Sequence, residues 1–144
     1  MIHRLAHYLF NRKLFLLANL ISKISRFLTG IEIHPSAHIG CGVLIDHGMG
    51  VIIGENVTIG YGCTIYQGVS LTTDKSKSGG GLILGRNVLV GSGAVVYGSY
   101  EIGDNCKIAS NAVVLDAIPK DSTVAVVPAT VVKQNGIRKR TPSL

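Results

Sequence analysis

The sequence contains no tryptophan, and aromatic residues make up only 6% of its 144 positions. Glycine, by contrast, is abundant at 18 residues, which suits repeated tight turns better than the long helices of a bundle. Charged residues are also scarce at 15%, but a hydrophobic fraction of 47% excludes a disordered polar chain. Together these proportions predict one folded domain whose core is made of small aliphatic side chains.

Cysteines and long hydrophobic runs are scarce as well. Cys41, Cys63 and Cys106 are odd in number and lack metal-type spacing, so we expect free thiols in a reducing cytoplasm and no bound metal. The longest apolar run, residues 14–21, contains Asn19 and is far shorter than the roughly 20 residues of a membrane span. No secretory signal pattern is visible either, which again predicts a cytoplasmic protein.

Acidic residues are missing from both ends of the chain. Residues 1–31 hold five Lys/Arg and no acid, and residues 122–144 hold four and no acid, within a net charge of +6. A phosphate-bearing partner or an anionic membrane surface fits this distribution. Nucleic-acid binding is not favoured, because the basic residues are terminal and lack interleaved aromatics.

Aliphatic residues recur every six positions through most of the chain. The thirteen positions are Ile33, Ile39, Ile45, Ile53, Ile59, Ile65, Leu71, Leu84, Val90, Val96, Ile102, Ile108 and Val114. Neither a helix nor a long strand has this period, whereas short strands joined by tight turns do. The repeat therefore predicts a coiled prism stabilised by the stacking of neighbouring coils. Cys63 and Cys106 fall at the small inward position two residues before an aliphatic one, which favours a packing role.

The repeat is interrupted twice. The step from Ile45 to Ile53 is eight residues, just after Asp46 and His47, and the step from Leu71 to Leu84 is thirteen. The second break predicts an excursion loop over residues 72–83, and loops inserted into a solenoid commonly lie on its working face.

The ends differ from the repeat. Residues 2–29 have a helical period with Leu14, Leu17, Ile21, Ile24 and Leu28 on one stripe. Two interpretations stay open: a helical cap over the open end of the solenoid, or a basic amphipathic segment in peripheral contact with a membrane. We expect a cap over residues 1–30, a solenoid over 31–132 and a basic tail over 133–144 whose tip is disordered.

His47 is the candidate for acid–base chemistry, since it stands in a glycine-flanked segment at the first break. A histidine can take the proton of an attacking hydroxyl, and a carboxylate partner would fix its tautomer. Glu32 lies fifteen residues earlier, close to one coil of three repeats, and is the candidate partner. Asp46 is expected to point away from His47, as neighbouring side chains do in extended backbone. The alternative is that His47 is only a turn residue on a prism edge.

The run GIEIHPSAHIGCGVLIDHGMGVIIGENVTIGYGCTIYQGVSL resembles the serine acetyltransferases of the hexapeptide-repeat superfamily, as do VGSGAVVYGSYEIGDNCKIASNAVV, VPATVV and the upstream RLAHYLFNR. This resemblance implies a mainly β fold, a left-handed parallel β-helix with a short N-terminal helical cap. It implies that His47 is the catalytic base, that Glu32 replaces an orienting aspartate and that Asp46 lines the acceptor site.

The same resemblance implies acetyl-CoA as cosubstrate, bound between neighbouring subunits of a homotrimer. The corresponding cofactor-binding residues are Thr72, Thr73, Ser92, Gly93 and Ser110, with Lys133 and the basic tail near the phosphates.

The resemblance also has three departures. Where the family's loop has an Arg-His pair for its amino-acid acceptor, this chain has Gly79, Gly80 and Gly81. We also expect the family's larger helical domain to be absent, which favours a simple trimer, and Val127 replaces a glycine. The expected function is O-acetylation of L-serine by acetyl-CoA. The alternatives are O-acetylation of a sugar hydroxyl in polysaccharide synthesis and a non-catalytic scaffold.

Overall fold

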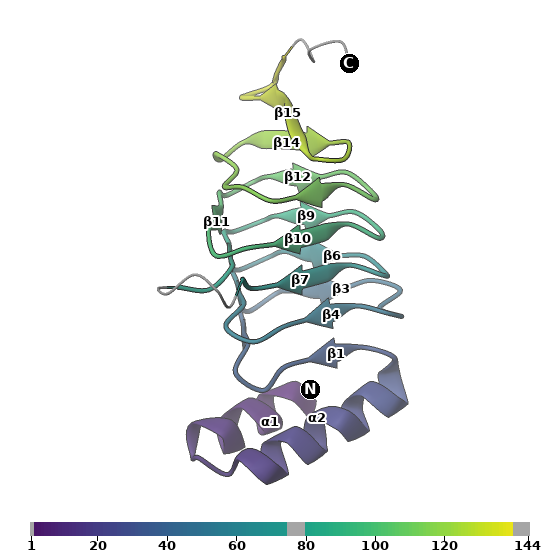
Figure 1. Ribbon diagram of the computed structural model, residues 1–144, viewed down its shortest axis with the longest axis vertical. Coiled ribbons are helices and arrows are strands. Elements are labelled where there is room, and N and C mark those ends of the chain that lie inside the picture. The colour runs from purple at the N-terminus through teal and green to yellow at the C-terminus, as the bar shows by residue number, and fades with distance from the viewer. Residues whose placement is uncertain (1, 75–79, 140–144) are drawn as a thin grey trace.

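The computed structural model describes residues 2–74 and 80–139. Two helices, α1 (Ile2–Asn11) and α2 (Phe15–Thr29), lie at one end of a stack of short strands, and the C-terminal strands lie at the other end (Figure 1). Gly30 caps the C-terminus of α2. It has a left-handed φ of 69°, and its backbone amide donates a hydrogen bond to the Arg26 carbonyl. The predicted helical segment is therefore a pair of helices with a turn at residues 12–14.

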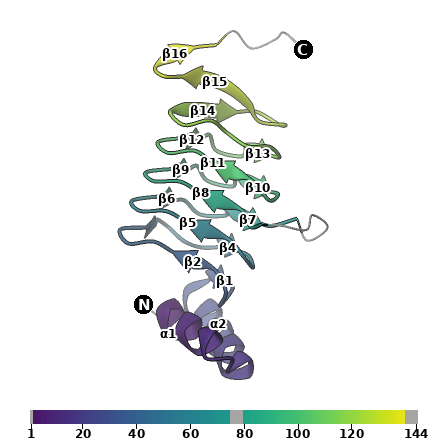
Figure 2. The same cartoon turned by 90° about the vertical axis from the view of Figure 1, so that its left-hand side faces the viewer.

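The strands form the three faces of a prism, and the strands within a face run parallel except at the C-terminal end of the third face (Figure 2). The first face contains β1 (Glu32–Ile33), β4 (Ile52–Ile53), β7 (Ser70–Thr72), β10 (Val95–Tyr97) and β13 (Val113–Val114). The second contains β2 (His38–Ile39), β5 (Thr58–Ile59), β8 (Ile83–Leu84) and β11 (Glu101–Ile102). The third contains β3 (Leu44–Ile45), β6 (Thr64–Ile65), β9 (Leu89–Val90), β12 (Lys107–Ile108) and β14 (Ser122–Ala125), followed by β15 (Thr130–Gln134) and β16 (Ile137–Arg138).

The strand register shows how the two breaks in the repeat are accommodated. A regular coil of three repeats pairs Ile52 with Ser70, eighteen positions along. Across the first break Glu32 pairs with Ile52, and across the second Ser70 pairs with Val95, so the extra residues sit in turns. Inward side chains consequently stay inward on both sides of each break.

The interior of the prism contains the predicted aliphatic positions from Ile53 to Val114, each at most 1% exposed. Cys63 and Cys106 are fully buried at the small inward positions, as their place in the repeat predicts. Ile33, Ile39 and Ile45 in the first coil are only partly buried. They line a cavity of about 380 Å³ between the helices and the first coil.

The helices cover the open end of the prism, as the cap interpretation predicts, but not through the whole predicted stripe. Ser22 donates a hydrogen bond to the Ile33 carbonyl at 2.6 Å, and Ala18 is fully buried. Leu17 and Ile24 remain about half exposed. The small side chains of α2 therefore face the solenoid, because they allow the helix to approach it closely. Most of the large apolar side chains of α2 point away from the solenoid.

The predicted boundary of the basic tail falls inside an element. Lys133 lies in β15, which pairs antiparallel with β14 and β16, so ordered backbone extends past residue 132. Backbone pairing with β14 continues the third face up to this point, so the first residues of the predicted tail lie in strands. Residues 140–144, including Arg140, and residues 75–79 of the excursion loop lie outside the described residues.

Candidate active site

The turn at residues 46–50 connects β3 to β4 and is fixed by contacts with the second coil and with the residue that caps α2. The Asp46 amide donates to the Ile65 carbonyl at 2.8 Å, and the Gly50 amide donates to the Gly30 carbonyl at 2.9 Å. A Cβ at Gly48 would meet the end of the Ile31 side chain, which would have to move to make room for it. The turn that contains His47 is therefore held between the start of the first coil and the second coil.

His47 adopts a left-handed backbone conformation, with φ of 52°. This region is uncommon for residues other than glycine, although histidine is enriched there, and residues held in it cluster at functional sites. The His47 side chain is 76% exposed, so its imidazole is accessible on this corner of the prism.

Asp46 approaches His47, against the expectation that it points away. Its Oδ1 lies 3.7 Å from His47 Nε2. The expectation holds for extended backbone, where successive side chains alternate, and the left-handed φ of His47 ends that alternation. Asp46 is thus the carboxylate nearest the imidazole in this conformation.

Glu32 has another partner in the structure. Its Oε2 lies 2.8 Å from the Arg26 guanidinium, and within the described ranges no hydrogen bond or ion pair joins it to His47. Both side chains of the Glu32–Arg26 pair are substantially exposed, so the pair adds little to the stability of the fold, and Glu32 can give up this partner for another at little cost. The orienting role of Glu32 stays a prediction.

Above His47, small residues form a column along the corner between the third and first faces. The amides of Gly68, Gly93 and Asn111 donate to the carbonyls of Met49, Gln67 and Ser92, each at 2.9 Å. The backbones of Gly50, Gly68 and Gly93 are stacked so closely that a Cβ on one would touch the next. Ser92, Gly93 and Ser110 therefore share one corner with His47.

Thr72, Thr73 and Lys133 lie elsewhere. Thr72 ends β7 at the opposite edge of the first face, and Thr73 Oγ1 donates to the Glu55 carbonyl at 3.0 Å. Lys133 lines a hollow of about 300 Å³ together with Lys107 and Asp121. The structure of one chain thus separates the predicted cofactor residues into a corner column and two outlying groups.

Gln67 and Asn111 belong to the column but were not singled out from the sequence. The sequence did contain a signal for Gln67, because Gln67, Ser92 and Ser110 stand at equivalent positions of successive coils once the extra residues of the second break are set aside. That spacing can be read only after the second break has been assigned to a turn.

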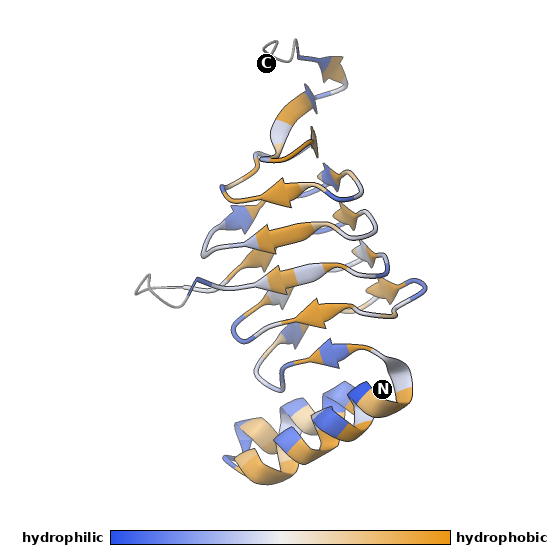
Figure 3. Ribbon diagram, turned by 45° about the vertical axis from the view of Figure 1, so that its right-hand side comes forward, coloured by the Kyte–Doolittle hydropathy of each residue, from blue (hydrophilic) through white to orange (hydrophobic). Residues whose placement is uncertain are grey.

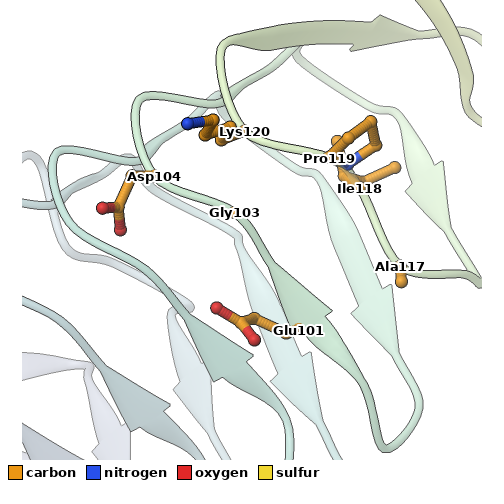
Figure 4. A pocket seen from close by; sticks show the side chains of 7 residues that line it. All are labelled: Glu101, Gly103, Asp104, Ala117, Ile118, Pro119 and Lys120. Atoms are coloured by element: carbon orange, nitrogen blue, oxygen red, sulfur yellow. The ribbon is translucent and has the colours of Figure 1, made fainter.

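A larger hollow, of about 560 Å³, is lined by residues within 101–104 and 117–120, in the two coils nearest the C-terminal end of the prism (Figure 4). Glu101, Asp104 and Lys120 line it, and Asp104 bonds the Arg86 amide and guanidinium. These bonds hold the pKa of Asp104 below its usual value. The hollow offers no imidazole, and one of its two carboxylates, Asp104, is already engaged by Arg86, so it is a weaker candidate for acid–base chemistry than the corner with His47. The described residues also contain no group of three or more His, Cys, Asp or Glu placed to hold a metal ion.

Two family models match the repeats. Residues 81–116 match "Bacterial transferase hexapeptide (six repeats)", and residues 50–74 match "Hexapeptide repeat of succinyl-transferase". A serine acetyltransferase of Staphylococcus aureus is 51% identical over 137 residues, which are 94% of this chain and 64% of that protein. The chain therefore spans a little less than two thirds of this relative.

Solved structures agree with the sequence matches. A Brucella abortus serine acetyltransferase in complex with coenzyme A has a TM-score of 0.89 and 34% identity, covering 94% of this chain and 54% of that one. A Neisseria gonorrhoeae serine acetyltransferase in complex with serine has a TM-score of 0.86 and 32% identity, covering 92% and 54%.

The repeats and the prism define a hexapeptide-repeat protein of the left-handed parallel β-helix class. The chain is similar to serine acetyltransferases over 94% of its own length, which corresponds to 64% of the Staphylococcus aureus relative and 54% of the Brucella abortus structure.

Proposed function

We propose that this chain is an acetyl-CoA-dependent O-acetyltransferase that acts on the hydroxyl of L-serine. The observation that carries the proposal is the corner where an accessible His47 stands at the base of a column of small residues. Similarity to proteins solved with coenzyme A and with serine supports the two substrates. The product, O-acetylserine, would place the chain in cysteine biosynthesis.

In the proposed reaction, His47 removes the proton of the acceptor hydroxyl while its oxygen attacks the thioester carbonyl carbon. The resulting tetrahedral oxyanion accepts hydrogen bonds from backbone amides near the turn. The C–S bond then breaks, and the imidazolium returns the proton to the departing thiolate of CoA. A carboxylate beside the imidazolium stabilises it, a role open to Glu32 by the family pattern and to Asp46 by its distance of 3.7 Å.

We further propose that acetyl-CoA lies along the corner column, because its stacked glycines at positions 50, 68 and 93 let a ligand approach the backbone. Thr72, Thr73 and the excursion loop would come from a neighbouring subunit of a homotrimer, which accounts for their distance from His47 within one chain. Lys133 would meet the phosphates. A cytoplasmic location is consistent with three free cysteines.

The test is to replace His47 with Asn and to measure CoA release from acetyl-CoA with L-serine. Loss of the general base should lower kcat by about 10² to 10⁴, with coenzyme A binding retained. His38→Asn is the matched control, because His38 is an exposed histidine on another face. Full activity of the His47 variant would refute the mechanism.

A sugar hydroxyl is a second candidate acceptor. At the described end of the excursion loop, Gly81 packs so closely on the Asn56 carbonyl that a Cβ would collide, so position 81 cannot carry a charged side chain. A zwitterionic acceptor loses binding energy without charged partners. CoA release measured with serine and with a panel of sugars distinguishes the two. Absence of turnover and of acetyl-CoA binding would instead support a scaffold.

A further inference from the structure

Helix α2 turns its largest apolar side chains away from the solenoid. Leu17, Leu20, Ile24 and Phe27 follow one another at intervals of three, four and three residues, which places them on one side of the helix. Their exposures are 50%, 55%, 49% and 89%, whereas Ala18 on the inner side is fully buried. We call Leu16, Leu17, Leu20, Ile24, Phe27 and Leu28 the outer stripe.

The outer stripe is wide and lies at one end of the molecule. Figure 3 shows hydrophobic segments along both helices, at the end of the prism opposite the C-terminal strands. Leu16 is 88% exposed, and Leu5 and Tyr8 of α1 are about half exposed. Contiguous exposed apolar surface of this kind marks an interaction site in a folded protein.

The charges around the outer stripe have one sign. Arg4, Arg12, Lys13 and Lys23 lie on or between the two helices, which contain no acidic residue. The nearby Arg26 is paired with Glu32. Lys13 also lines a hollow of about 430 Å³ with residues 14–17, so a cation stands directly beside the start of the apolar surface.

We propose that the helical pair binds the surface of an anionic lipid bilayer, with the outer stripe in the interfacial region. Charge complementarity selects this occupant, because lysine and arginine beside exposed leucine and phenylalanine are typical of helices that lie in a membrane interface. No helix among the described residues is long and apolar enough to cross a bilayer. The helices would therefore lie on the surface, and the prism would project from it.

A second copy of the chain fits the outer stripe less well. Joining two such surfaces would bring two sets of arginines and lysines together without an acid in either helical pair. Such like-charge contact opposes association, whereas anionic head groups would neutralise the same charges.

The test is co-sedimentation of the full chain with phosphatidylglycerol vesicles and with phosphatidylcholine vesicles. We expect binding to the anionic vesicles that weakens as salt is raised. The double variant Leu16→Ser/Phe27→Ser removes two apolar anchors, so its affinity for the anionic vesicles should fall by a factor of about ten or more. Lys23→Gln should weaken binding about fivefold.

Ile137→Ser is the matched control, because Ile137 is 72% exposed at the opposite end of the molecule, and it should leave binding unchanged. Circular dichroism and acetyl transfer measured in solution check that the double variant is folded, independently of lipid. Equal binding to both vesicle types, no binding, or full binding by the double variant would overturn the proposal. So would a fall in oligomer size in the double variant without any vesicle binding by the parent chain, which would assign the outer stripe to self-association.

Discussion

The three cysteines occupy two different environments. Cys63 and Cys106 are buried, and their thiols donate to the carbonyls of Gly85 and Pro119 at 3.1 Å. Burial raises the pKa of both thiols above the ordinary value, so less thiolate is present near neutrality. Cys41 is exposed in a turn.

We therefore predict that one thiol per chain reacts rapidly with an aromatic disulfide reagent at pH 8. Cys63 and Cys106 should react only after denaturant is added, because the reagent has no access to them in the folded prism. Cys41→Ser should remove the fast phase and leave the slow one. A fast phase in that variant would contradict the prediction.

At Arg26 and Glu32 a surface ion pair competes with a predicted catalytic role. Arg26→Gln should lower the free energy of unfolding by less than about 1 kcal/mol, because both side chains are exposed. If Glu32 orients His47, Glu32→Gln should lower kcat at least about tenfold, whereas Arg26→Gln should not. Denaturant unfolding and steady-state kinetics on both variants measure the two effects. Equal kcat in the parent and Glu32→Gln would leave Asp46 as the partner of the base.

The sequence predicted the position of His47 at a break, but not the direction of its neighbours. Side-chain direction at Asp46 depends on the left-handed backbone of the next residue, and histidine does not require that conformation. The partner of Glu32 depends on where α2 places Arg26, and spacing along the solenoid carries no information on this contact.

Within the turns between strands, asparagine and aspartate form a ladder. Asn87, Asn105 and Asp121 have φ values of 55°, 59° and 57° and occupy the same corner in successive coils. Asn87 Nδ2 donates to Asn105 Oδ1 at 3.4 Å, and Asn105 Nδ2 donates to Asp121 Oδ1 at 2.9 Å. These residue types tolerate the left-handed region better than others do, so the ladder joins local turn chemistry to coil stacking.

Asn105→Ala should lower the free energy of unfolding by about 1–2 kcal/mol, because alanine is strained at this φ and makes neither ladder bond. Asn105→Gly loses the same bonds without the strain, so it should be less destabilising. Denaturant unfolding of both variants checks the order. A glycine variant less stable than the alanine variant would show that the backbone conformation contributes nothing.

The six-residue period was sufficient to predict the strands and the core from Ile53 to Val114. It was less successful for Ile33, Ile39 and Ile45, which have no preceding coil beneath them. Their burial depends on how closely the helices approach, and this is set by small residues such as Ala18 and Ser22, which give no hydrophobic signal.

At the scale of the whole molecule, histidines attach the helical pair to the solenoid. His3 Nε2 lies 3.2 Å from the Ala37 carbonyl, and His7 Nδ1 lies 2.8 Å from the Pro35 carbonyl. Burial lowers the pKa of His3, partly opposed by the bond to Ala37, and the nearby His7, Arg4 and His38 lower it further. Burial therefore favours the neutral imidazole of His3 in the folded chain.

Because the unfolded chain binds a proton at His3 near pH 6.5 and the folded chain only at lower pH, stability should fall as pH drops below about 6.5. The loss continues until the pH passes the lowered pKa of His3. We expect Tm to decrease from pH 7.5 to pH 5.5, and to decrease less in His3→Gln, which cannot be protonated. Thermal unfolding followed by circular dichroism measures both; an equal decrease in the two proteins would contradict the assignment to His3.

The strand register across the excursion loop has a consequence for how such a protein diversifies. Ser70 pairs with Val95 and Thr64 with Leu89 as if the extra residues were not there. A change in the length of this insertion therefore leaves the strand pairing of the prism, and the corner with His47, in place, provided that the contacts of Thr73 and Gly81 with the preceding coil are kept. Selection can thus vary the length and sequence of the insertion without redesigning the scaffold, and an engineer can do the same.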